Sequence, residues 1–470
     1  MRNILIFLLL FCTLYASDLP KYSLCDKSDY KPIKNHKGQI YTKKGDFATI
    51  SPFKNDNETA WAKRFGMVEM GGVDDSHITK KLLKQKDLLS VRHRLGYDWM
   101  PAFYFYTDGH NRDFVKWLYK NRNTTTLNPN GPFIHCKKNG YDWCKDYFYD
   151  WGYEEIIDKR VEDLSKNLKR SGFNGVFFDW ASGNFIKSDE FKSMSETFKK
   201  RHPKKNYFEQ VGKFYNKLKK RGIFFVTNQA FRNDKYLLKY ITYDMTESYI
   251  TTDSTKKIKI QIKGKGWIDS VKVTNYYPIY KNSSSIKDSL HFINVLTTLK
   301  QKYTKHGFKN FIYMNYIAPK YIKIYPNFPL YKIVKPKNAI YFSYAMAKLT
   351  NNIEYAEIPD MKEFERDEIY FYDLGTPYGK NYSKLKDLDI YVRFFKNGFV
   401  LVSEAYHKDI YLQINSSFIP KNRMILDAYR NDWIKSDDNG TTVVKLHFEK
   451  GTFSKKPLPL GRVYLYEKRD

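Results

Sequence analysis

Amphipathic stretches alternate with short, continuously apolar runs along most of the chain. In the amphipathic stretches apolar side chains recur every three or four residues and a glycine follows the last of them, which is typical of a helix that ends in a left-handed cap. The helices predicted in this way span residues 75–95, 153–170, 208–221 and 290–306. The apolar runs that follow them predict strands at 99–106, 175–180, 223–228 and 311–316. Such uninterrupted apolar strands are typical of a parallel sheet with both faces buried.

Further apolar runs complete the predicted sheet, at 46–52, 67–71, 243–249 and 339–346. About eight strands separated mostly by helices, over residues 46–380, favour an α/β fold of the (β/α)8 TIM barrel type. A doubly wound open sheet is the alternative. Its dinucleotide-binding form is disfavoured, because no Gly-x-Gly-x-x-Gly motif follows the first strand.

One segment inside the barrel region has a strand pattern of a different kind. Ile258, Ile260 and Ile262 alternate with polar, mostly basic residues, and two glycines follow. This pattern predicts a β-hairpin insertion near residues 255–275, after the sixth predicted strand. The hairpin would either pack on the barrel as a lid or contact an anionic substrate.

The helical pattern stops near residue 386, and short strand-like runs continue to residue 470. Asn397-Gly398 between two of these runs is a strong hairpin-turn signal. The predicted strands are 389–395, 398–403, 410–414, 442–448 and 462–466. We therefore expect residues 386–470 to form a small all-β C-terminal sandwich domain.

The N-terminus has the pattern of a secretory signal peptide. A short basic start is followed by an uncharged apolar stretch from Ile4 to Leu14 and by the small residues Ala16 and Ser17. This pattern predicts a signal peptide at residues 1–17, followed by an N-terminal extension at 18–45. We expect a secreted or periplasmic protein with no stable membrane insertion after cleavage. An uncleaved N-terminal anchor is the alternative.

Cysteine and histidine spacing predicts one local disulfide and no metal site. Export makes disulfides possible, and Cys136 and Cys144, which flank a short loop, are the natural pair. The cysteines are not spaced with histidines as zinc ligands would be, and no His-Glu-x-x-His motif occurs. We therefore expect neither a metal nor another cofactor.

The charge of the chain narrows the choice of partners. The 470 residues carry a formal net charge of +30, and 17% of them are aromatic. Such a charge indicates an anionic partner, and aromatic faces are the usual platform for sugar rings or bases, although compositional bias explains the aromatic share equally well. The lysines are spread over the whole chain, and no zinc finger or RNA-recognition motif is present. Nucleic acid is therefore not an expected partner.

Polar residues that end apolar strands are the candidates for chemistry, because a (β/α)8 barrel carries its active site at the carboxyl ends of its strands. Asp179 and Glu247 hold such positions on two different strands. Hydrolysis of a glycosidic bond needs two carboxyl groups, one to protonate the leaving oxygen and one to attack the sugar or activate water. Asp179 could instead cap a helix and Glu247 could pair with a lysine. Because both carboxylates end strands of one predicted barrel, we favour a catalytic role for them over these structural roles.

The sequence around these two carboxylates resembles a known enzyme family. The run Gly172-Phe173-Asn174-Gly175-Val176-Phe177-Phe178-Asp179 is similar to the Gly-Phe-Asp-Gly-Val-Phe-Leu-Asp strand of TIM-barrel glycoside hydrolases similar to endo-α-1,4-polygalactosaminidases. Residues 225–228 and 245–249 resemble the next two strands of those barrels. This chain has Asn174 where the family usually carries aspartate.

The resemblance extends to residues 395–402, which are similar to a strand pair of the β-domain that often follows these barrels. It implies a carbohydrate-active barrel with Asp179 and Glu247 as catalytic carboxylates. We expect Asp179 to be the nucleophile or base and Glu247 the general acid.

Other strand-end residues are candidates for binding the substrate. Amides, hydroxyls and carboxylates there could hydrogen-bond sugar hydroxyls, and aromatic rings could stack on sugar rings, with an ordinary core position as the alternative for each ring. The candidates are Glu69, Tyr104, Tyr106, Trp180, Asn228, Tyr249 and Asn315. Tyr344 holds a similar place on the strand predicted at 339–346.

Taken together, these patterns predict an exported glycoside hydrolase that cleaves a poly- or oligosaccharide containing anionic groups or amino sugars. A non-catalytic carbohydrate-binding protein on the same barrel is one alternative. A basic surface protein that binds acidic polymers is the other.

Overall fold

The computed structural model describes most of the chain after its first nineteen residues. The described residues are 20–50, 56–72, 86–99, 103–105, 117, 133–135, 146–187, 189–247, 250, 252–262, 266–276, 286–316, 320–321, 323–324, 332–333, 337–357, 367–450 and 457–469. The predicted signal peptide at 1–17, and Cys136 and Cys144, lie outside them. In the described part, no helix combines the length and apolarity that a membrane span requires.

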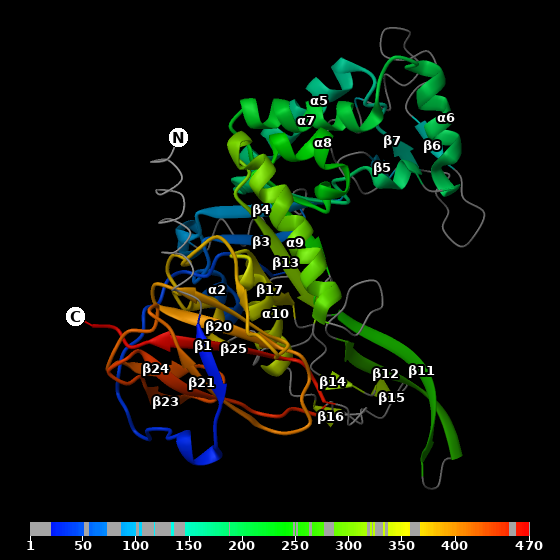
Figure 1. Cartoon of the computed structure of the whole chain (residues 1–470). Coiled ribbons are helices and arrows are strands. Elements are labelled where there is room, and N and C mark those ends of the chain that lie inside the picture. Colours follow the sequence, from blue (N-terminus) through cyan, green and yellow to red (C-terminus); the bar gives the residue numbers. More distant parts are fainter. Residues whose placement is uncertain are drawn as a thin grey trace, which may run out of the picture. The chain divides into compact units, whose positions relative to one another are not determined.

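An eight-stranded sheet is the centre of the fold, and its strand order follows the chain (Figure 1). Its strands are β2 (Ala48–Thr49), β3 (Met67–Gly72), β4 (His93–Trp99), β8 (Gly175–Asp179), β9 (Phe224–Asn228), β10 (Tyr243–Glu247), β13 (Asn310–Tyr316) and β17 (Ile353–Glu357). Each neighbouring pair from β2 to β10 is parallel. Parallel strands in chain order, joined by helical connections, define a (β/α)8 barrel. The predicted fold class, a TIM barrel followed by a C-terminal β domain, is confirmed.

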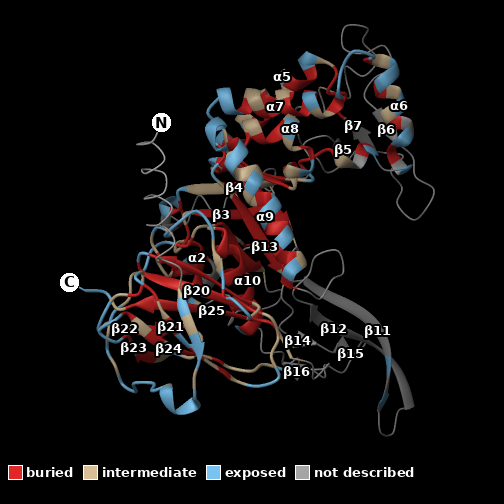
Figure 2. Cartoon of the chain, viewed as in Figure 1, coloured by how far each residue is buried: buried red, intermediate tan, exposed pale blue. Residues whose placement is uncertain are grey.

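Three of the predicted helices form close to their predicted positions. They are α5 (Glu154–Ser171), α7 (Tyr207–Lys220) and α9 (Ile286–Tyr303). Gly172 ends α5 in the left-handed conformation with φ 76°, and its N–H donates to Leu168 O as a cap. The buried residues of α5 and α7 fall on one face of each helix (Figure 2). The amphipathic pattern therefore identified both the length of these helices and the face that packs inward.

The end of the helix predicted at 75–95 and the strand predicted at 99–106 are wrong in position, and residues 75–85 lie outside the described part of the chain. The third barrel strand, β4, runs from His93 to Trp99, directly after a 3-10 turn at Lys86–Ser90. Gly96, taken from the sequence as a helix cap, lies inside β4 and pairs with Val176 of β8. A glycine in a strand and a glycine after a helix have the same sequence signal, and here the strand pairing decides.

Residues 103–105, expected to belong to the barrel, form β5 (Phe103–Phe105) in a separate sheet. This sheet has the order β5-β7-β6, with β7 at Asp146–Phe148 and β6 at Phe133–His135, and both pairs are antiparallel. Tyr104 is therefore not at the end of a barrel strand.

The strand predicted at 339–346 is a helix. The structure forms α10 (Lys337–Leu349) there, with every residue from Asn338 to Leu349 buried, so Tyr344 is a helical residue. A helix buried on all sides lacks an amphipathic period, and its apolar run looks like a buried strand. The last barrel strand is β17, which follows α10 after a short turn.

A long antiparallel hairpin follows β10. Its strands are β11 (Thr252–Ile262) and β12 (Gly266–Tyr276), which pair along their whole length. A short strand, β15 (Lys323–Ile324), pairs with β12 on the other side. A role for this hairpin as a lid or as a contact for an anionic substrate stays a prediction.

The C-terminal β region consists of two sheets with a shared core. One sheet has six strands, β18 (Ser383–Lys384), β19 (Ile390–Phe395), β20 (Gly398–Ser403), β22 (Met424–Asp427), β23 (Asp432–Lys435) and β25 (Leu460–Tyr466). The other consists of β1 (Lys21–Leu24), β21 (Ile410–Asn415) and β24 (Thr441–Leu446). Buried residues of both sheets form one hydrophobic cluster, including Phe399 and Leu401 from the first and Leu412 and Val444 from the second. The N-terminal extension thus supplies an edge strand to this sandwich, because β1 pairs antiparallel with β21.

The chain divides into two compact units. One comprises Met1–Lys44, Ser248–Asn294 and Tyr313–Asp470, and the other comprises Gly45–Glu247 and Val295–Ile312. Within the first unit α10 lies directly against β25. Arg462 of β25, which is fully buried, donates from Nη1 to Asn338 Oδ1 at 3.0 Å, and its guanidinium lies 3.7 Å from the ring centre of Tyr429.

Gly461 lies where β25 approaches the backbone of α10 with no room for a side chain, and we expect Gly461→Ala to be strongly destabilising. A methyl group there would collide with the backbone of Tyr341 and Phe342 of α10, and backbone atoms cannot move aside as a flexible side chain can. Overpacking of this kind costs about 3 kcal/mol. Chemical denaturation measures the effect, with Gly66→Ala as the control, since the nearest atom to the added methyl there is Gly45 O at 3.7 Å. Equal stability of the two variants would contradict this packing.

Candidate active site

Three polar residues end three consecutive parallel strands. Asp179 is the last residue of β8, Asn228 of β9 and Glu247 of β10. Carboxyl ends of parallel strands meet at one edge of a sheet, so these side chains come from one rim of the barrel. All three residues were predicted at strand ends, and the structure puts them on three adjacent strands of the sheet.

The side-chain amide of Asn228 joins the two carboxylates. Its Nδ2 donates to Asp179 Oδ1 at 2.7 Å and to Glu247 Oε2 at 2.9 Å. An amide nitrogen carries two hydrogens, so each carboxylate receives one of them. Asn228 is 3% exposed, and its position is therefore set by its surroundings rather than by solvent. The sequence proposed Asn228 as a ligand for sugar hydroxyls, and in this structure its amide orients the two carboxylates.

Tyr97 is a member of the site that the sequence did not identify. It lies on β4, and its hydroxyl donates to Asp179 Oδ2 at 2.8 Å. Burial raises the pKa of Tyr97 above its ordinary value, and the nearby charges of Asp179, Glu69 and Glu247 raise it further. The phenol therefore keeps its proton and remains a donor. The sequence placed this strand at 99–106, six residues after its start at His93, and Tyr97 was therefore not among the strand-end candidates.

Asp179 accepts hydrogen bonds on both of its oxygens. Oδ2 receives the Tyr97 hydroxyl, and Oδ1 receives the Asn228 amide and the backbone N–H of Trp180 at 2.8 Å. All three partners are donors, which suits an ionised carboxylate. Asp179 is consequently held by two neighbouring strands, β4 and β9, and by the N–H of the next residue.

Glu69 brings a third carboxylate to the same cluster. It lies on β3, is 5% exposed, and accepts a hydrogen bond from the backbone N–H of Gly71 at 3.0 Å. Its charge acts on Tyr97 together with those of Asp179 and Glu247. Glu69, which the sequence proposed as a strand-end candidate, thus lies close enough to Tyr97 for its charge to act on the same cluster.

The chain turns sharply directly after Asp179 and directly after Asn228. Trp180 has φ 51° and Gln229 has φ 62°, a left-handed conformation that is uncommon for residues other than glycine and often accompanies functional sites. Trp180 is 53% exposed. Its ring is thus available to a ligand beside Asp179, as a sugar platform requires.

Asp244 holds the turn that follows Asn228. Its carboxylate accepts from Thr227 Oγ1 at 2.8 Å and from the backbone N–H groups of Ala230 and Phe231 at 2.9 and 2.8 Å. The residue is fully buried, and burial raises its pKa to about 7 although these hydrogen bonds lower it. Asp244 therefore positions Asn228 from the side of β10 that does not carry Glu247.

Of the remaining predicted residues, the structure describes Asn315 and Tyr104. Asn315 lies on β13, where it is buried and its Oδ1 accepts from the N–H of Ile250 at 3.3 Å. Tyr104 lies on β5, outside the barrel sheet. Tyr106 and Tyr249 lie outside the described residues. Their roles in binding stay predictions. In the described part, no group of three or more His, Cys, Asp or Glu side chains is arranged to hold a metal ion.

Several solved structures resemble this chain in fold. The glycoside hydrolase domain of PelA from Pseudomonas aeruginosa is 10% identical over 68% of this chain and 96% of its own, with a TM-score of 0.36. A maltogenic α-amylase, AmyB from Thermotoga neapolitana, is 10% identical over 90% of this chain and 98% of its own, with a TM-score of 0.45. A β-L-arabinopyranosidase from Geobacillus stearothermophilus is 8% identical over 91% and 96%, with a TM-score of 0.42. No protein-family model and no curated protein matches the sequence.

A buried carboxyl outside this cluster gives the fold a testable pH dependence. Glu354 of β17 is 4% exposed and accepts from Ser343 Oγ at 2.7 Å. Burial raises its pKa to about 8, against the opposing effects of Ser343, Asn315 and Lys348 and with a smaller contribution from Asp367. The folded protein therefore retains a proton that the unfolded chain, with an ordinary glutamate, loses near pH 4.5.

The free energy of unfolding should consequently fall as the pH rises from 5 to 8. The contribution of one such group reaches about 1.4 kcal/mol per pH unit. Glu354→Gln removes it, so denaturant titrations of the two proteins at several pH values should give curves that diverge with the variant becoming relatively more stable toward pH 8. Parallel curves would show that Glu354 is ionised in the folded protein.

Proposed function

We propose that this protein is a glycoside hydrolase that cleaves a poly- or oligosaccharide, with Asp179 and Glu247 as its catalytic carboxylates. The observation that carries the proposal is the amide of Asn228, which donates to both. The two acceptor oxygens lie 2.7 and 2.9 Å from one nitrogen. They are thus within about 6 Å of each other, close to the ~5–5.5 Å separation of carboxyl groups in retaining enzymes and below the ~6.5–9.5 Å of inverting ones.

This spacing supports a two-step retaining mechanism. An Asp179 oxygen attacks the anomeric carbon, while Glu247 gives its proton to the departing glycosidic oxygen. The covalent glycosyl-enzyme is then hydrolysed by a water molecule whose proton passes back to Glu247. The three donors that face Asp179 support its assignment as the nucleophile, because they stabilise its anionic form before attack.

The charge of the chain bears on the substrate. The resemblance to polygalactosaminidase-like barrels points to an amino-sugar polymer, which is cationic when its amines are free. A formal net charge of +30 opposes the approach of such a polymer and favours an anionic one. We therefore favour a polysaccharide with acidic groups over an amino-sugar polymer. Export through a signal peptide at residues 1–17 belongs to the same proposal, since polysaccharides of this kind are met outside the cytoplasm.

The decisive experiment is the release of reducing sugar by the wild-type protein, with Asp179→Asn and Glu247→Gln as comparisons. The panel consists of acidic polysaccharides, amino-sugar polymers and neutral glucans. Either substitution should reduce turnover by roughly 10²–10⁴-fold, while circular dichroism shows that the variants remain folded. Binding of glycan without turnover by the wild type would instead identify a carbohydrate-binding protein. Binding of acidic polymers that weakens with added salt and is unaffected by Asp179→Asn would identify a basic surface protein.

Tyr97→Phe tests the positioning of Asp179 separately. Loss of one hydrogen bond to the carboxylate should reduce kcat roughly tenfold, with little change in KM. Because the phenol orients Asp179 and was not placed against the substrate, the loss should fall on kcat and not on KM. A rise in KM, or a lower free energy of unfolding that accounts for the lost activity, would mean that Tyr97 contributes only to packing.

A further inference from the structure

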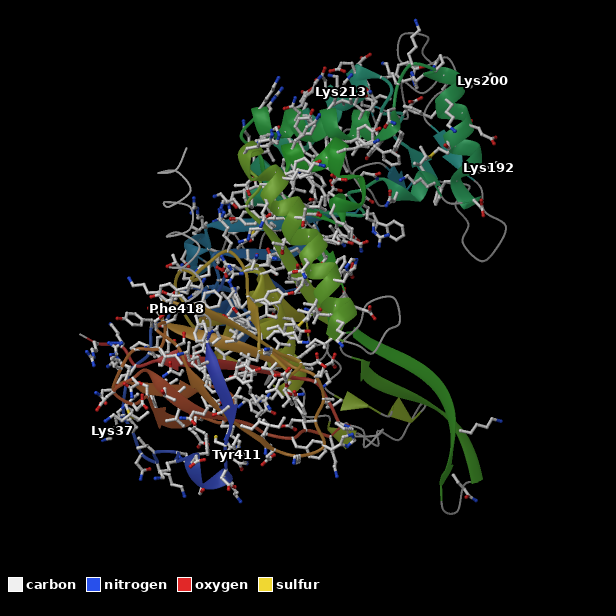
Figure 3. All side chains as sticks on the ribbon, in the orientation of Figure 1. Lys37, Lys192, Lys200, Lys213, Tyr411 and Phe418 are labelled. Carbon is white, nitrogen blue, oxygen red and sulfur yellow. The ribbon has the colours of Figure 1, made fainter. Side chains whose placement is uncertain are left out.

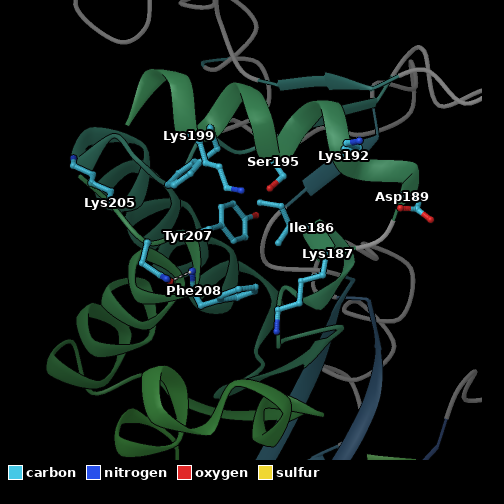
Figure 4. A pocket seen from close by; sticks show the side chains of 11 residues that line it. Ile186, Lys187, Asp189, Lys192, Ser195, Lys199, Lys205, Tyr207 and Phe208 are labelled. Atoms are coloured by element: carbon cyan, nitrogen blue, oxygen red, sulfur yellow. Dashed lines mark hydrogen bonds between the residues drawn. The ribbon is translucent and has the colours of Figure 1, made fainter. Parts of the chain in front are cut away.

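A second site lies in the connection between β8 and α7, on the chain segment that begins directly after Asp179. A pocket of about 430 Å³ opens there, between the 3-10 turn Asn184–Lys187, helix α6 (Lys192–Arg201) and the start of α7 (Figure 4). In a (β/α)8 barrel the segments that follow the carboxyl ends of the strands build the substrate site. The pocket is therefore on a part of the fold that such enzymes use for binding.

The walls of the pocket are strongly cationic. Lys187, Lys192, Lys199 and Lys205 line it, against the single carboxylate of Asp189. Lys187 Nζ lies 4.9 Å from the ring centre of Phe208 and 3.4 Å from Asn233 Oδ1, and Lys205 Nζ donates to Gly152 O at 2.6 Å. These partners are neutral, and in the described part of the chain none of the four ammonium groups has a carboxylate within ion-pair distance. The positive charge of the pocket is thus not neutralised locally.

The floor of the pocket is apolar and tightly packed. Ile186, Phe198 and Tyr207 are 6%, 2% and 5% exposed, and the rings of Phe198 and Tyr207 meet edge to face with centres 5.2 Å apart. In Figure 4, Ser195 and Lys199 extend from α6 toward Tyr207. The site therefore combines an aromatic surface with cations and a hydroxyl. This combination suits a sugar ring that carries an anionic group.

We propose that this pocket binds the anionic substituent of a sugar residue, a carboxylate or a sulfate, and so serves as a subsite for an acidic polysaccharide. Lys192 and Lys199 face the anion from α6, and the apolar floor contacts the ring. This inference rests on the proposed action on carbohydrate and deepens it, because it names the charge class of the substrate. It also places the recognition of that charge on a segment separate from the three carboxylates at the barrel rim.

The test is binding of defined oligosaccharides to the full-length protein and to its Asp179→Asn variant, measured by calorimetry. The probes are a uronic acid oligomer, a sulfated oligomer of the same length and a neutral oligomer. The double variant Lys192→Gln/Lys199→Gln should weaken binding of the charged oligomers roughly tenfold. The matched control is Lys200→Gln/Lys213→Gln, which removes the same charge from α6 and α7 at residues outside the pocket lining (Figure 3). Its affinity should stay within about twofold of the parent protein.

Asp189→Asn supplies a change of opposite sign, because it removes the one carboxylate of the lining and should tighten binding of both charged oligomers. Equal losses in the two double variants would overturn the proposal and attribute binding to diffuse surface charge. So would equal affinity for the charged and neutral oligomers.

Failure of this inference differs measurably from failure of the proposed enzyme. Hydrolysis of a neutral or amino-sugar polymer at full rate by the Lys192→Gln/Lys199→Gln variant would leave the hydrolase in place and remove the anionic subsite. If the wild type binds the charged oligomers through the pocket but does not cleave them, the anionic subsite stands and the hydrolase does not.

Discussion

The geometry of the candidate site depends on one side-chain amide that is shared between two carboxylates. Asn228 can donate to Asp179 and Glu247 together only if its own backbone is fixed, since a shift at the end of β9 would break one of the two hydrogen bonds. Asp244 provides that constraint by holding the turn after Asn228 through the N–H groups of Ala230 and Phe231. A buried carboxylate that accepts several hydrogen bonds is thus used to place an amide, and the amide in turn places the two groups that would react.

A second buried carboxylate with a structural role lies on β4, the strand beside β8. On β4, Tyr97 faces Asp179, and the next residue, Asp98, bonds to Arg160 of α5. Arg160 also pairs with Asp163 at 2.8 Å, and all three charged groups are buried. Burial raises the pKa of Asp98 to about 6, although the guanidinium opposes this. Removing one member of such a network leaves an uncompensated buried charge, which costs about 3–5 kcal/mol. Two successive residues of β4, which point to opposite faces of the sheet, therefore serve the site and the attachment of α5.

The parts of the fold that the sequence predicted are those with a clear period. Helices α5 and α7 have one buried face each, and the strands after them end in the residues Asp179 and Asn228 that the sequence singled out. The parts it misplaced lack that signal. Helix α10 is buried on all sides, so its apolar run was taken for a strand.

The sequence did not identify Tyr97 for a related reason. Gly96 has the local signature of a helix cap, and only its pairing with Val176 of β8 shows that it belongs to a strand. The hydrogen bonds that Asn228 and Tyr97 donate to Asp179 could not be predicted from the sequence either, because they join residues that are 49 and 82 positions apart. Strand-end position identifies candidate carboxylates from sequence. The groups that orient them depend on which strands are neighbours, and that information is in the fold.

The electrostatics of the molecule act at two length scales with opposite signs. Over long range the +30 chain attracts polyanions, whereas at the barrel rim the charges of Glu69 and Asp179 act on Tyr97. The oxocarbenium-like transition state of glycoside hydrolysis develops positive charge at the anomeric carbon, so local carboxylates stabilise it. An acidic substrate would be repelled by those same carboxylates unless its charged groups were held elsewhere. The cationic pocket that we propose as a subsite on the segment after Asp179 would resolve this conflict, because it would bind the anionic substituent at a distance from the reacting bond.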